Sequence, residues 1–364
     1  MKITRFSADG FRNLKDVEFF PDEEMNVIYG ENGQGKTNII EAMWLYTGCY
    51  SFRTQKNIHL IAEGNDFAKT ELDFFAHGRD QTAKMTVAAK KDIILNGINC
   101  DSPRQMLGEF YAVVFSPSML SVVKEGPGER RKFLNVAISL VKPNYAGVMS
   151  KYLRVLAQRN SVLKKMSEMQ LPPEYLEALD VEFVRLASKI IRYRLDYIEE
   201  LKESAGSIYG GISSDREKFS FTYDFSKNEK MSDDEIKEKL KLSLEKSRES
   251  DIRRQFTATG PQTDDLILTL DGRDARSYGS QGQQRSCALA LKLAEASIVR
   301  KLTGERPVVL LDDVMSELDE RRQNFILNYL SEGQVFITCC DPSQLLRSAK
   351  GKAFEVKNGK AVNI

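Results

Sequence analysis

The residues best suited to chemistry stand at positions 30–37, which read Gly-Glu-Asn-Gly-Gln-Gly-Lys-Thr. They match the phosphate-binding pattern G-x-x-x-x-G-K-[ST], the Walker A motif, at every defined position. Glycines let the backbone wrap around phosphates with dihedrals that other residues resist, and its N–H groups then donate to the anion. Lys36 is placed to contact the β- and γ-phosphates of ATP, and the Thr37 hydroxyl is placed to bind Mg²⁺.

The flanking segments give this motif the context that it requires. Residues 25–29 read as a short buried strand, and residues 38–45 read as a helix with one apolar face. A strand, a glycine-rich loop and a helix in this order are typical of a phosphate site rather than of a glycine-rich turn with an incidental lysine. The predicted ATP-binding residues are Gly30, Glu31, Asn32, Gly33, Gln34, Gly35, Lys36, Thr37 and Asn38.

Two acidic residues near the other end of the chain, Asp312 and Asp313, follow an apolar run at 308–311 that reads as a central strand of a parallel sheet. Asp312 would bind Mg²⁺ directly or through water, and Asp313 would orient the attacking water or act as general base. Taken alone, these residues would favour a solvated acidic turn. With the loop, they predict catalytic roles for Lys36, Asp312 and Asp313, and metal ligation by Thr37 and Asp312.

Residues 280–284, Ser-Gln-Gly-Gln-Gln, resemble the signature peptide of ABC-type ATPases, and residues 316–319, Ser-Glu-Leu-Asp, resemble their D-loop. Ser280 is a good N-cap for the helix that apolar spacing predicts over 283–302. In ABC ATPases the signature binds the γ-phosphate held by the other protomer, so the resemblance implies a homodimer with ATP at composite sites. The alternative is an ordinary capped amphipathic helix. The contacts expected from the signature are Ser280, Gly282 and Gln283.

Composition places few limits on function but bears on location. The chain has 364 residues, 41% hydrophobic and 29% charged, with a formal net charge of +1. The first residues lack the apolar core of a signal peptide, and no 18-residue apolar run occurs, so we expect a cytoplasmic protein with no membrane partner. The five cysteines include no C-x-x-C pair. Because Cys339 and Cys340 are adjacent, they are unsuited to sharing a zinc ion, and we expect reduced core residues.

The chain is expected to form three parts. Residues 1–126 would be the amino-terminal half of an ATPase domain, with Walker A. Residues 127–254 would be an inserted, mostly helical arm domain. Residues 255–364 would complete the ATPase domain with the signature, the Walker B strand and the D-loop.

Within the arm, apolar spacing predicts successive helices. One opens at Pro127, a second follows Pro143, and a third follows Pro172-Pro173. Gly206 and Gly210-Gly211 are expected to break the third helix, because glycine disfavours helix interiors.

Six further segments carry a family resemblance: residues 10–14, 115–117, 125–127, 130–134, 279–285 and 289–295. Through them the sequence resembles, from end to end, the RecF family of bacterial recombination-mediator ATPases. The resemblance implies an α/β fold: an ABC-type P-loop ATPase domain, similar to an SMC head, split by an inserted helical arm. It also implies ATP-dependent dimerisation on DNA, slow hydrolysis, and gap repair with RecO and RecR partners.

Some positions depart from related sequences. Residues 260–265 read Gly-Pro-Gln-Thr-Asp-Asp, where relatives usually have Gly-Pro-His-Arg-Asp-Asp, so Thr263 is neutral where relatives carry a guanidinium. Asp313 is shorter than the glutamate of most ABC enzymes. The switch histidine of ABC transporters is not evident after 336–338.

A basic segment at residues 129–165 holds nine lysines and arginines against one acid, Glu129. Such concentration in a near-neutral chain favours a surface that follows DNA phosphates. No helix-turn-helix or aromatic platform stands out, so we expect binding to duplex, gapped or junction DNA without sequence readout. The alternative is a solvated basic helix face. The predicted DNA contacts are Arg130, Arg131, Lys132, Lys151 and Arg154.

These observations favour a DNA-binding ATPase clamp over two other interpretations and leave a third open. An SMC head would need hundreds of heptad-patterned residues between its Walker motifs, whereas prolines and glycines interrupt this insert. A transporter ATPase subunit would lack the basic segment. A scaffold in which ATP only gates DNA binding would differ from an enzyme in showing no turnover with or without DNA.

Overall fold

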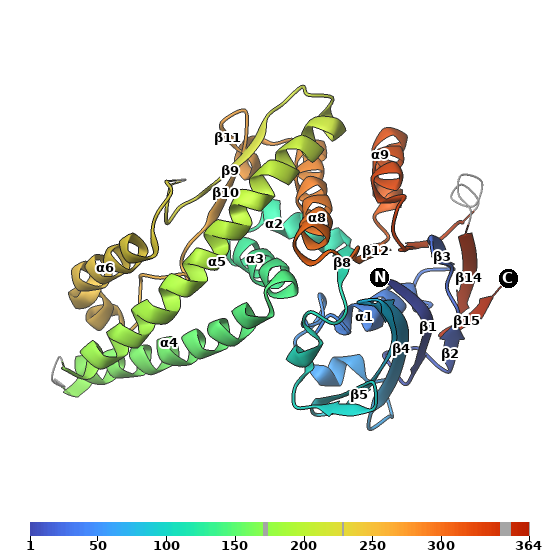
Figure 1. The fold of residues 1–364 in the computed structure, drawn as a ribbon, viewed down its shortest axis with the longest axis horizontal. Helices are drawn as coiled ribbons and strands as arrows, with labels where there is room; N and C mark the ends of the chain where they lie inside the picture. Colours follow the sequence, from blue (N-terminus) through green and yellow to red (C-terminus); the bar gives the residue numbers. More distant parts are fainter. Residues whose placement is uncertain (170–173, 228, 343–350, 364) are drawn as a thin grey trace. The chain divides into compact units, whose positions relative to one another are not determined.

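The computed structural model forms two compact units (Figure 1). The first unit contains residues 1–119, 211–214 and 288–364, and the second contains 120–210 and 215–287. Residues 255–287, expected with the second half of the ATPase domain, therefore group with the second unit. The division into ATPase and arm domains stays a prediction. The structure describes residues 1–169, 174–227, 229–342 and 351–363.

A mainly parallel sheet forms the centre of the first unit. The predicted strands at 25–29 and 308–311 are both confirmed, and they lie on either side of β13. Since all three run parallel, the ends of β3 and β12 meet at one edge of the sheet, where ligands of such sheets bind. The strands, in spatial order, are β15 (Lys360–Asn363), β14 (Gly351–Lys357), β3 (Met25–Tyr29), β13 (Val335–Cys339), β12 (Val308–Asp312) and β8 (Ala112–Phe115).

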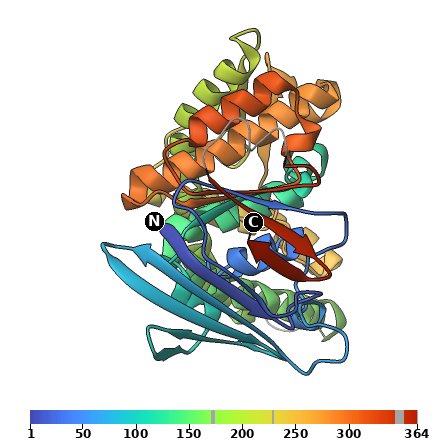
Figure 2. The ribbon, with the colours of Figure 1, turned by 90° about the vertical axis from the view of Figure 1, so that its right-hand side faces the viewer.

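A second, antiparallel sheet belongs to the same unit and is drawn in blue and cyan in Figure 2. Side chains alternate between buried and exposed along its strands, as expected for a sheet with one covered face. Helix α1 (Lys36–Leu45) contacts strands of both sheets, and its apolar residues, Trp44 among them, are almost completely buried. The strands are β2 (Val17–Phe19), β1 (Lys2–Asp9), β4 (Ala68–Ala76), β5 (Arg79–Val87), β6 (Lys91–Leu95) and β7 (Ile98–Cys100).

The second unit is mostly helical. α3 begins at Pro127 and α4 at Pro143, which confirms both predicted starts. α5 begins at Glu174, and Pro172-Pro173 lie outside the described residues. Its elements are α2 (Ser121–Lys124), α3 (Pro127–Val141), α4 (Pro143–Met169), α5 (Glu174–Ser213), β9 (Phe219–Tyr223), α6 (Asp233–Arg254), β10 (Leu266–Leu270), β11 (Arg273–Asp274) and α7 (Ala275–Tyr278). The last residues of α5, 211–213, group with the first unit.

The prediction that glycines break α5 is wrong, because the helix continues through Gly206, Gly210 and Gly211. Close packing explains why glycine stands at two of these positions. A Cβ at Gly210 would lie 2.4 Å from the Asp215 carboxylate, and one at Gly211 would lie 2.7 Å from the Phe325 ring. The cost of glycine in a helix, about 1 kcal/mol each, is offset by the contacts that its missing side chain permits.

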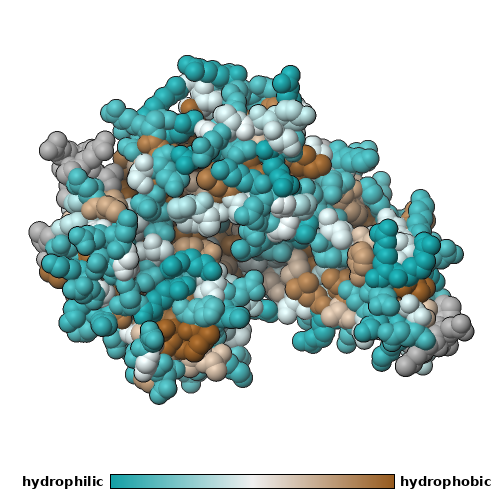
Figure 3. Space-filling view, turned by 180° about the vertical axis from the view of Figure 1, so that it is seen from behind, coloured by the Kyte–Doolittle hydropathy of each residue, from teal (hydrophilic) through white to brown (hydrophobic). Residues whose placement is uncertain are grey.

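Among the described residues, no helix combines the length and apolar character needed to cross a bilayer. On the face seen in Figure 3, hydrophilic side chains predominate and hydrophobic ones form separate patches.

Two further helices follow in the chain. α8 (Gln281–Thr303) begins in the second unit and ends in the first, and α9 (Glu320–Leu330) follows β12.

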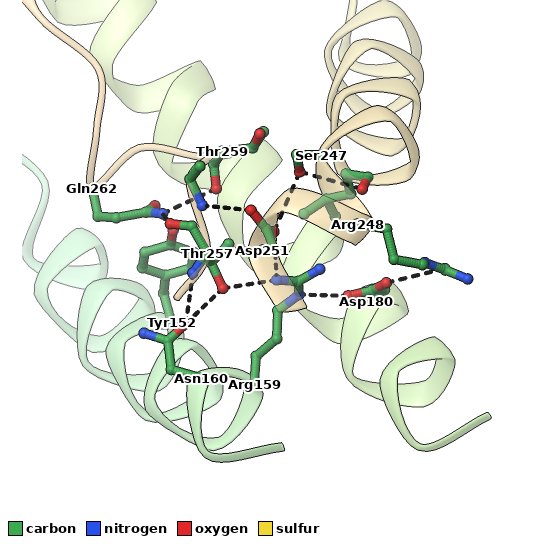
Figure 4. Close-up of polar contacts among 12 residues, drawn as sticks. Tyr152, Arg159, Asn160, Asp180, Ser247, Arg248, Asp251, Thr257, Thr259 and Gln262 are labelled. Atoms are coloured by element: carbon green, nitrogen blue, oxygen red, sulfur yellow. Dashed lines mark hydrogen bonds and ion pairs between the residues drawn. The ribbon is translucent and has the colours of Figure 1, made fainter. Parts of the chain in front are cut away.

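A buried ion-pair network joins three helices of the second unit (Figure 4). Arg159 on α4 has no exposed surface. Its Nε donates to Asp180 of α5 at 2.7 Å, and its Nη1 donates to Asp251 of α6 at 2.9 Å. The Thr257 hydroxyl accepts a further bond from Nη1 at 2.8 Å. Arg159 belongs to the basic segment of the sequence, but its charge is paired with two carboxylates and does not reach the surface.

Arg159→Met should destabilise the second unit by about 3–5 kcal/mol, because breaking a buried ion pair leaves uncompensated charge inside. Urea unfolding, followed by circular dichroism, measures the loss. Arg185→Met is the matched control on α5, since Arg185 pairs with Glu182 at the exposed surface. Equal small effects of both substitutions would contradict the structural role of Arg159.

Candidate functional site

The loop between β3 and α1 takes the backbone conformations that its glycines permit. Gly30, Gly33 and Gly35 have φ of 147°, 81° and 122°. A Cβ at Gly30 would also lie 2.3 Å from the carbonyl oxygen of Val356. Side chains at these positions would strain or displace the loop, as expected for a phosphate-binding loop.

Lys36, the first residue of α1, is 7% exposed. Its Nζ donates to the backbone carbonyls of Gly30 at 2.6 Å and Glu31 at 2.9 Å. The loop therefore holds its own lysine at the helix N-terminus. There an ammonium group and backbone N–H groups share one small region, which is suited to a polyphosphate.

Asp312, at the end of β12, joins α1 to the sheet. The Thr37 hydroxyl donates to Asp312 Oδ1 at 2.8 Å, and the Thr338 hydroxyl of β13 donates to the same oxygen at 3.0 Å. The structure thus brings together the two residues predicted to bind Mg²⁺. A hydroxyl and a carboxylate are the hard oxygen ligands that this ion prefers. Burial raises the pKa of Asp312, and the two hydroxyl bonds oppose that rise.

Asp313 is exposed and turns away from the strand direction, with φ of 53°. Such a left-handed conformation is uncommon for a residue with a side chain. The Thr338 hydroxyl accepts from its backbone N–H at 2.9 Å, and Ser316 donates to its carboxylate at 3.2 Å. Thr338 therefore fixes both acidic residues, a role that sequence reasoning missed because only the parallel register places β13 beside β12.

Asn13 supports the loop from outside the motif. Its Nδ2 donates to the Gly33 carbonyl at 2.8 Å, and its Oδ1 accepts from Asn38 at 2.6 Å. Arg53 donates to the other end of the Asn38 amide at 2.6 Å. The segment 10–14 carried the family resemblance, but the sequence alone gave no role to Asn13.

A fully buried carboxylate, Glu41, lies on α1. Arg12 binds it with two bonds of 2.5 and 2.8 Å, Ser51 donates at 2.5 Å, and Arg53 donates at 3.1 Å. These contacts fix the helix that carries Lys36. The sequence offered one signal for this role, because Glu41 stands between apolar residues on the expected helix. Such a position indicates a buried acid, and a buried acid requires a partner.

The C-terminal hairpin and a cysteine complete the surroundings of the loop. The Asn358-Gly359 turn joins β14 to β15, and the Asn358 N–H donates to Gln34 at 2.6 Å. Cys340 is an exposed free thiol, 3.2 Å from the Asn32 side chain. The expectation that every cysteine is a core residue is therefore wrong for Cys340, whereas Cys287 is buried.

The signature residues lie in the second unit, whereas the loop and Asp312 lie in the first. α8 begins at Gln281, and the Ser280 hydroxyl accepts from the Gln283 N–H at 3.3 Å. In return the Gln283 side chain accepts from the Ser280 N–H at 2.6 Å. This reciprocal pair is a capping box, and it confirms Ser280 as the N-cap. Ser280 remains exposed, while Gly282 and Gln283 are half-buried.

The predicted DNA contacts separate into two kinds. Arg130 is 7% exposed and binds both carboxylate oxygens of Asp265, at 2.6 and 2.8 Å. Arg131 is half-buried and donates to a backbone carbonyl at 2.8 Å. Arg130 is therefore committed to the fold, which removes it from a phosphate-binding surface in this conformation. Lys132, Lys151 and Arg154 are exposed.

Gln262 and Thr263, the two residues that depart from the usual pattern at 260–265, form hydrogen bonds within their own loop. The Gln262 amide donates to the carbonyls of Thr257 and Thr259, both at 3.0 Å, and its oxygen accepts from Tyr152. The Thr263 hydroxyl donates to the Gly260 carbonyl at 2.8 Å. Thr263 is exposed and offers no cation. Beside it, burial raises the pKa of Asp264 to about 6.

In metal-free buffer, Asp312→Asn should raise the stability of the nucleotide-free protein at neutral pH. A folded pKa above the ordinary carboxyl value means that stability is present in acid and is lost as pH rises through the folded pKa. Asparagine removes that loss and keeps an oxygen for both threonines. The gain, measured as the shift in thermal midpoint, should shrink below about pH 4.

Asp319→Asn is the control with the opposite sign. The Arg322 backbone N–H lowers the pKa of Asp319, so its ionised form stabilises the fold above the ordinary pKa. This substitution should not raise the midpoint. A lower midpoint for Asp312→Asn at neutral pH would contradict the account of Asp312.

The comparisons with known proteins agree on one family. The family model described as RecF/RecN/SMC N terminal domain matches residues 2–361. The chain is 38% identical to the DNA replication and repair protein RecF of Clostridium tetani, with 100% of both chains covered. It is also 38% identical to RecF of Halothermothrix orenii, covering 99% of this chain and 98% of that one.

Solved structures extend this similarity to the fold. One is described as the recombination mediator protein RecF-ATP in the RecFOR pathway; it is 36% identical, with TM-score 0.93, covering 100% of this chain and 97% of that one. An Smc head bound to the C-winged helix domain of ScpA has TM-score 0.57 at 16% identity, covering 100% of this chain and 98% of that one, which shows a shared fold alone. The α/β architecture of an ABC-type ATPase head is thereby confirmed, and the chain belongs to the RecF family.

Proposed function

We propose that this protein is an ATP-dependent DNA-binding protein of recombinational gap repair, which dimerises on DNA and slowly hydrolyses ATP. The observation that carries the proposal is the contact between Thr37 and Asp312, 2.8 Å apart beside the glycine loop. It joins the two halves of a nucleotide site whose motifs are 275 residues apart. Relatives solved with ATP and named for the RecFOR pathway support both the nucleotide and partners of the RecO and RecR type.

Each residue of the nucleotide site has a distinct task. The N–H groups of the loop and Lys36 bind the phosphates. Thr37 and Asp312 would hold Mg²⁺, which supplies positive charge to the phosphate oxygens when bound. Asp313 accepts the proton of the attacking water, and Thr338 places it by binding its backbone N–H. Asp313 is shorter than the glutamate of most ABC enzymes and would hold the attacking water less closely, which fits slow turnover.

The signature residues complete the site of a second copy. Ser280 is exposed at the N-terminus of α8, which is 23 residues long. Such a terminus offers a hydroxyl and the backbone N–H groups of its first turn to an anion. The γ-phosphate held by a partner protomer is that anion, so ATP acts as the contact between two copies.

Ser280→Arg should abolish the ATP-dependent dimer and leave ATP binding by each subunit within about twofold of the wild type, because Ser280 serves the opposite site. Sedimentation with ATP, ADP or no nucleotide measures assembly, and equilibrium binding of a fluorescent ATP analogue measures affinity. Lys36→Ala is the matched comparison and should lose both properties, since it removes the main cation at the phosphates. A Ser280→Arg protein that still dimerises with ATP would refute the composite site.

The DNA surface is proposed to include Lys132 on α3 and Lys151 and Arg154 on α4. All three are exposed, and the basic residues around them are flexible long side chains suited to phosphates. Phosphate contact without base readout explains why a helical surface with no recognition helix would suffice. Gapped or junction DNA offers phosphates along two directions and is the proposed target.

Replacing Lys132, Lys151 and Arg154 together by glutamine should weaken DNA binding and make it less dependent on salt. The slope of log affinity against log salt should fall by about 0.9 for each phosphate contact removed on duplex DNA. A salt titration with gapped duplex in saturating ATP measures this slope. Lys84→Gln, on β5 of the first unit, is the control and should leave the slope unchanged. An unchanged slope in the triple variant would place DNA elsewhere.

A further inference from the structure

A line of hydrogen bonds connects the long helix α5 to the signature peptide. The Tyr209 hydroxyl of α5 donates to Glu217 Oε2 at 2.6 Å. Glu217 Oε1 accepts from Gln283 Nε2, also at 2.6 Å. Gln283 Oε1 in turn accepts from the Ser280 N–H at 2.6 Å. All four residues belong to the second unit, so this line lies within one compact body.

Glu217 determines which way the Gln283 amide faces. An ionised carboxylate can only accept, so it binds the NH₂ end of the amide and leaves the oxygen end for Ser280. If the amide turned over, its NH₂ group would meet the Ser280 N–H, and two donors would face one another. The Ser280 hydroxyl also accepts from the Gln283 N–H, so the orientation of this one side chain fixes both polar groups of the N-cap.

Tyr209 fixes Glu217 in turn. The tyrosine is 1% exposed and packs its ring against Phe219 of β9, with centroids 5.3 Å apart. Its hydroxyl therefore has little freedom, and it holds the carboxylate that lies on the connection between α5 and β9. A half-buried carboxylate held from one side by a rigid phenol is a suitable anchor for a side chain on another helix.

We propose that Glu217 is a positioning residue for the signature peptide: it orients Gln283, and through Gln283 it holds Ser280 ready for the γ-phosphate of a nucleotide bound to a second copy. The inference rests on the proposed ATP-dependent dimer. Glu217 contacts neither the phosphate nor the metal in this scheme. Its effect is preorganisation, which saves the ordering of Ser280 and Gln283 at the moment of assembly.

The test compares two substitutions of Glu217 with a control on α5. Glu217→Ala should weaken the ATP-dependent dimer about tenfold, because each of two composite sites loses one orienting hydrogen bond. ATP affinity of the single subunit should stay at the wild-type value, while the thermal midpoint should fall slightly because the buried Tyr209 hydroxyl loses an acceptor. Glu217→Gln should assemble within about twofold of wild type, since its oxygen accepts from Gln283 and its NH₂ donates to Tyr209. Glu182→Ala, at an exposed site on α5, should have no effect.

Each outcome decides between the proposals. If Glu217→Ala assembles like wild type while Ser280→Arg does not, the positioning role is overturned and the composite site stands. If both variants assemble, the proposed function fails first. If Glu217→Gln is as weak as Glu217→Ala, the carboxylate charge matters instead of the hydrogen-bond pattern, and the inference is wrong.

A folding defect in Glu217→Ala would move the test to Tyr209→Phe, which removes the hydroxyl that holds Glu217. This variant should weaken the dimer about threefold with ATP affinity unchanged, because one of the two bonds that orient the carboxylate remains. Sedimentation in saturating ATP measures the dimer, as before. A Tyr209→Phe protein that folds and assembles like wild type would also overturn the positioning role.

Discussion

The first unit depends on one carboxylate oxygen, Asp312 Oδ1, which accepts hydroxyl bonds from Thr37 and Thr338. Through it, the helix that begins the nucleotide site is fixed to two neighbouring strands. The parallel register of β12 and β13 makes this possible, since Asp312 pairs with Thr338 across the sheet. The carboxylate is 4% exposed and its pKa is raised by burial. Burial therefore makes the ionised carboxylate costly, and a cation bound beside this oxygen would stabilise it.

Local patterns made much of this site predictable. The glycine loop, the strand before it and the helix after it are contiguous, so their spacing carries the whole signal. The same holds for the apolar strand before Asp312, for the Asn358-Gly359 hairpin, and for the capping residue Ser280. In each case a few adjacent residues determine both the conformation and the chemistry, and periodicity or turn preference is enough to identify them.

Long-range pairings could not be predicted in the same way. Thr338 gains its role only from the strand beside it, Glu41 from an arginine 29 residues earlier, and Asn13 from a loop 20 residues later. The glycines of α5 show the converse. Their low helix propensity predicted a break, but the helix continues. The lack of space explains the glycine at position 211, because a side chain there would collide with the Phe325 ring.

Charge in the second unit shows why counting basic residues overstates a binding surface. Arg130 and Arg159 are both drawn into the interior, where each satisfies carboxylates from a distant part of the chain. A guanidinium suits this task because its fixed fork binds two oxygens at once, whereas a lysine ammonium is strongly hydrated and stays outside. The exposed lysines around them, such as Lys151, are consequently held on rigid helices. The buried arginines thus stabilise the helices that carry the exposed cations, rather than adding to the cationic surface themselves.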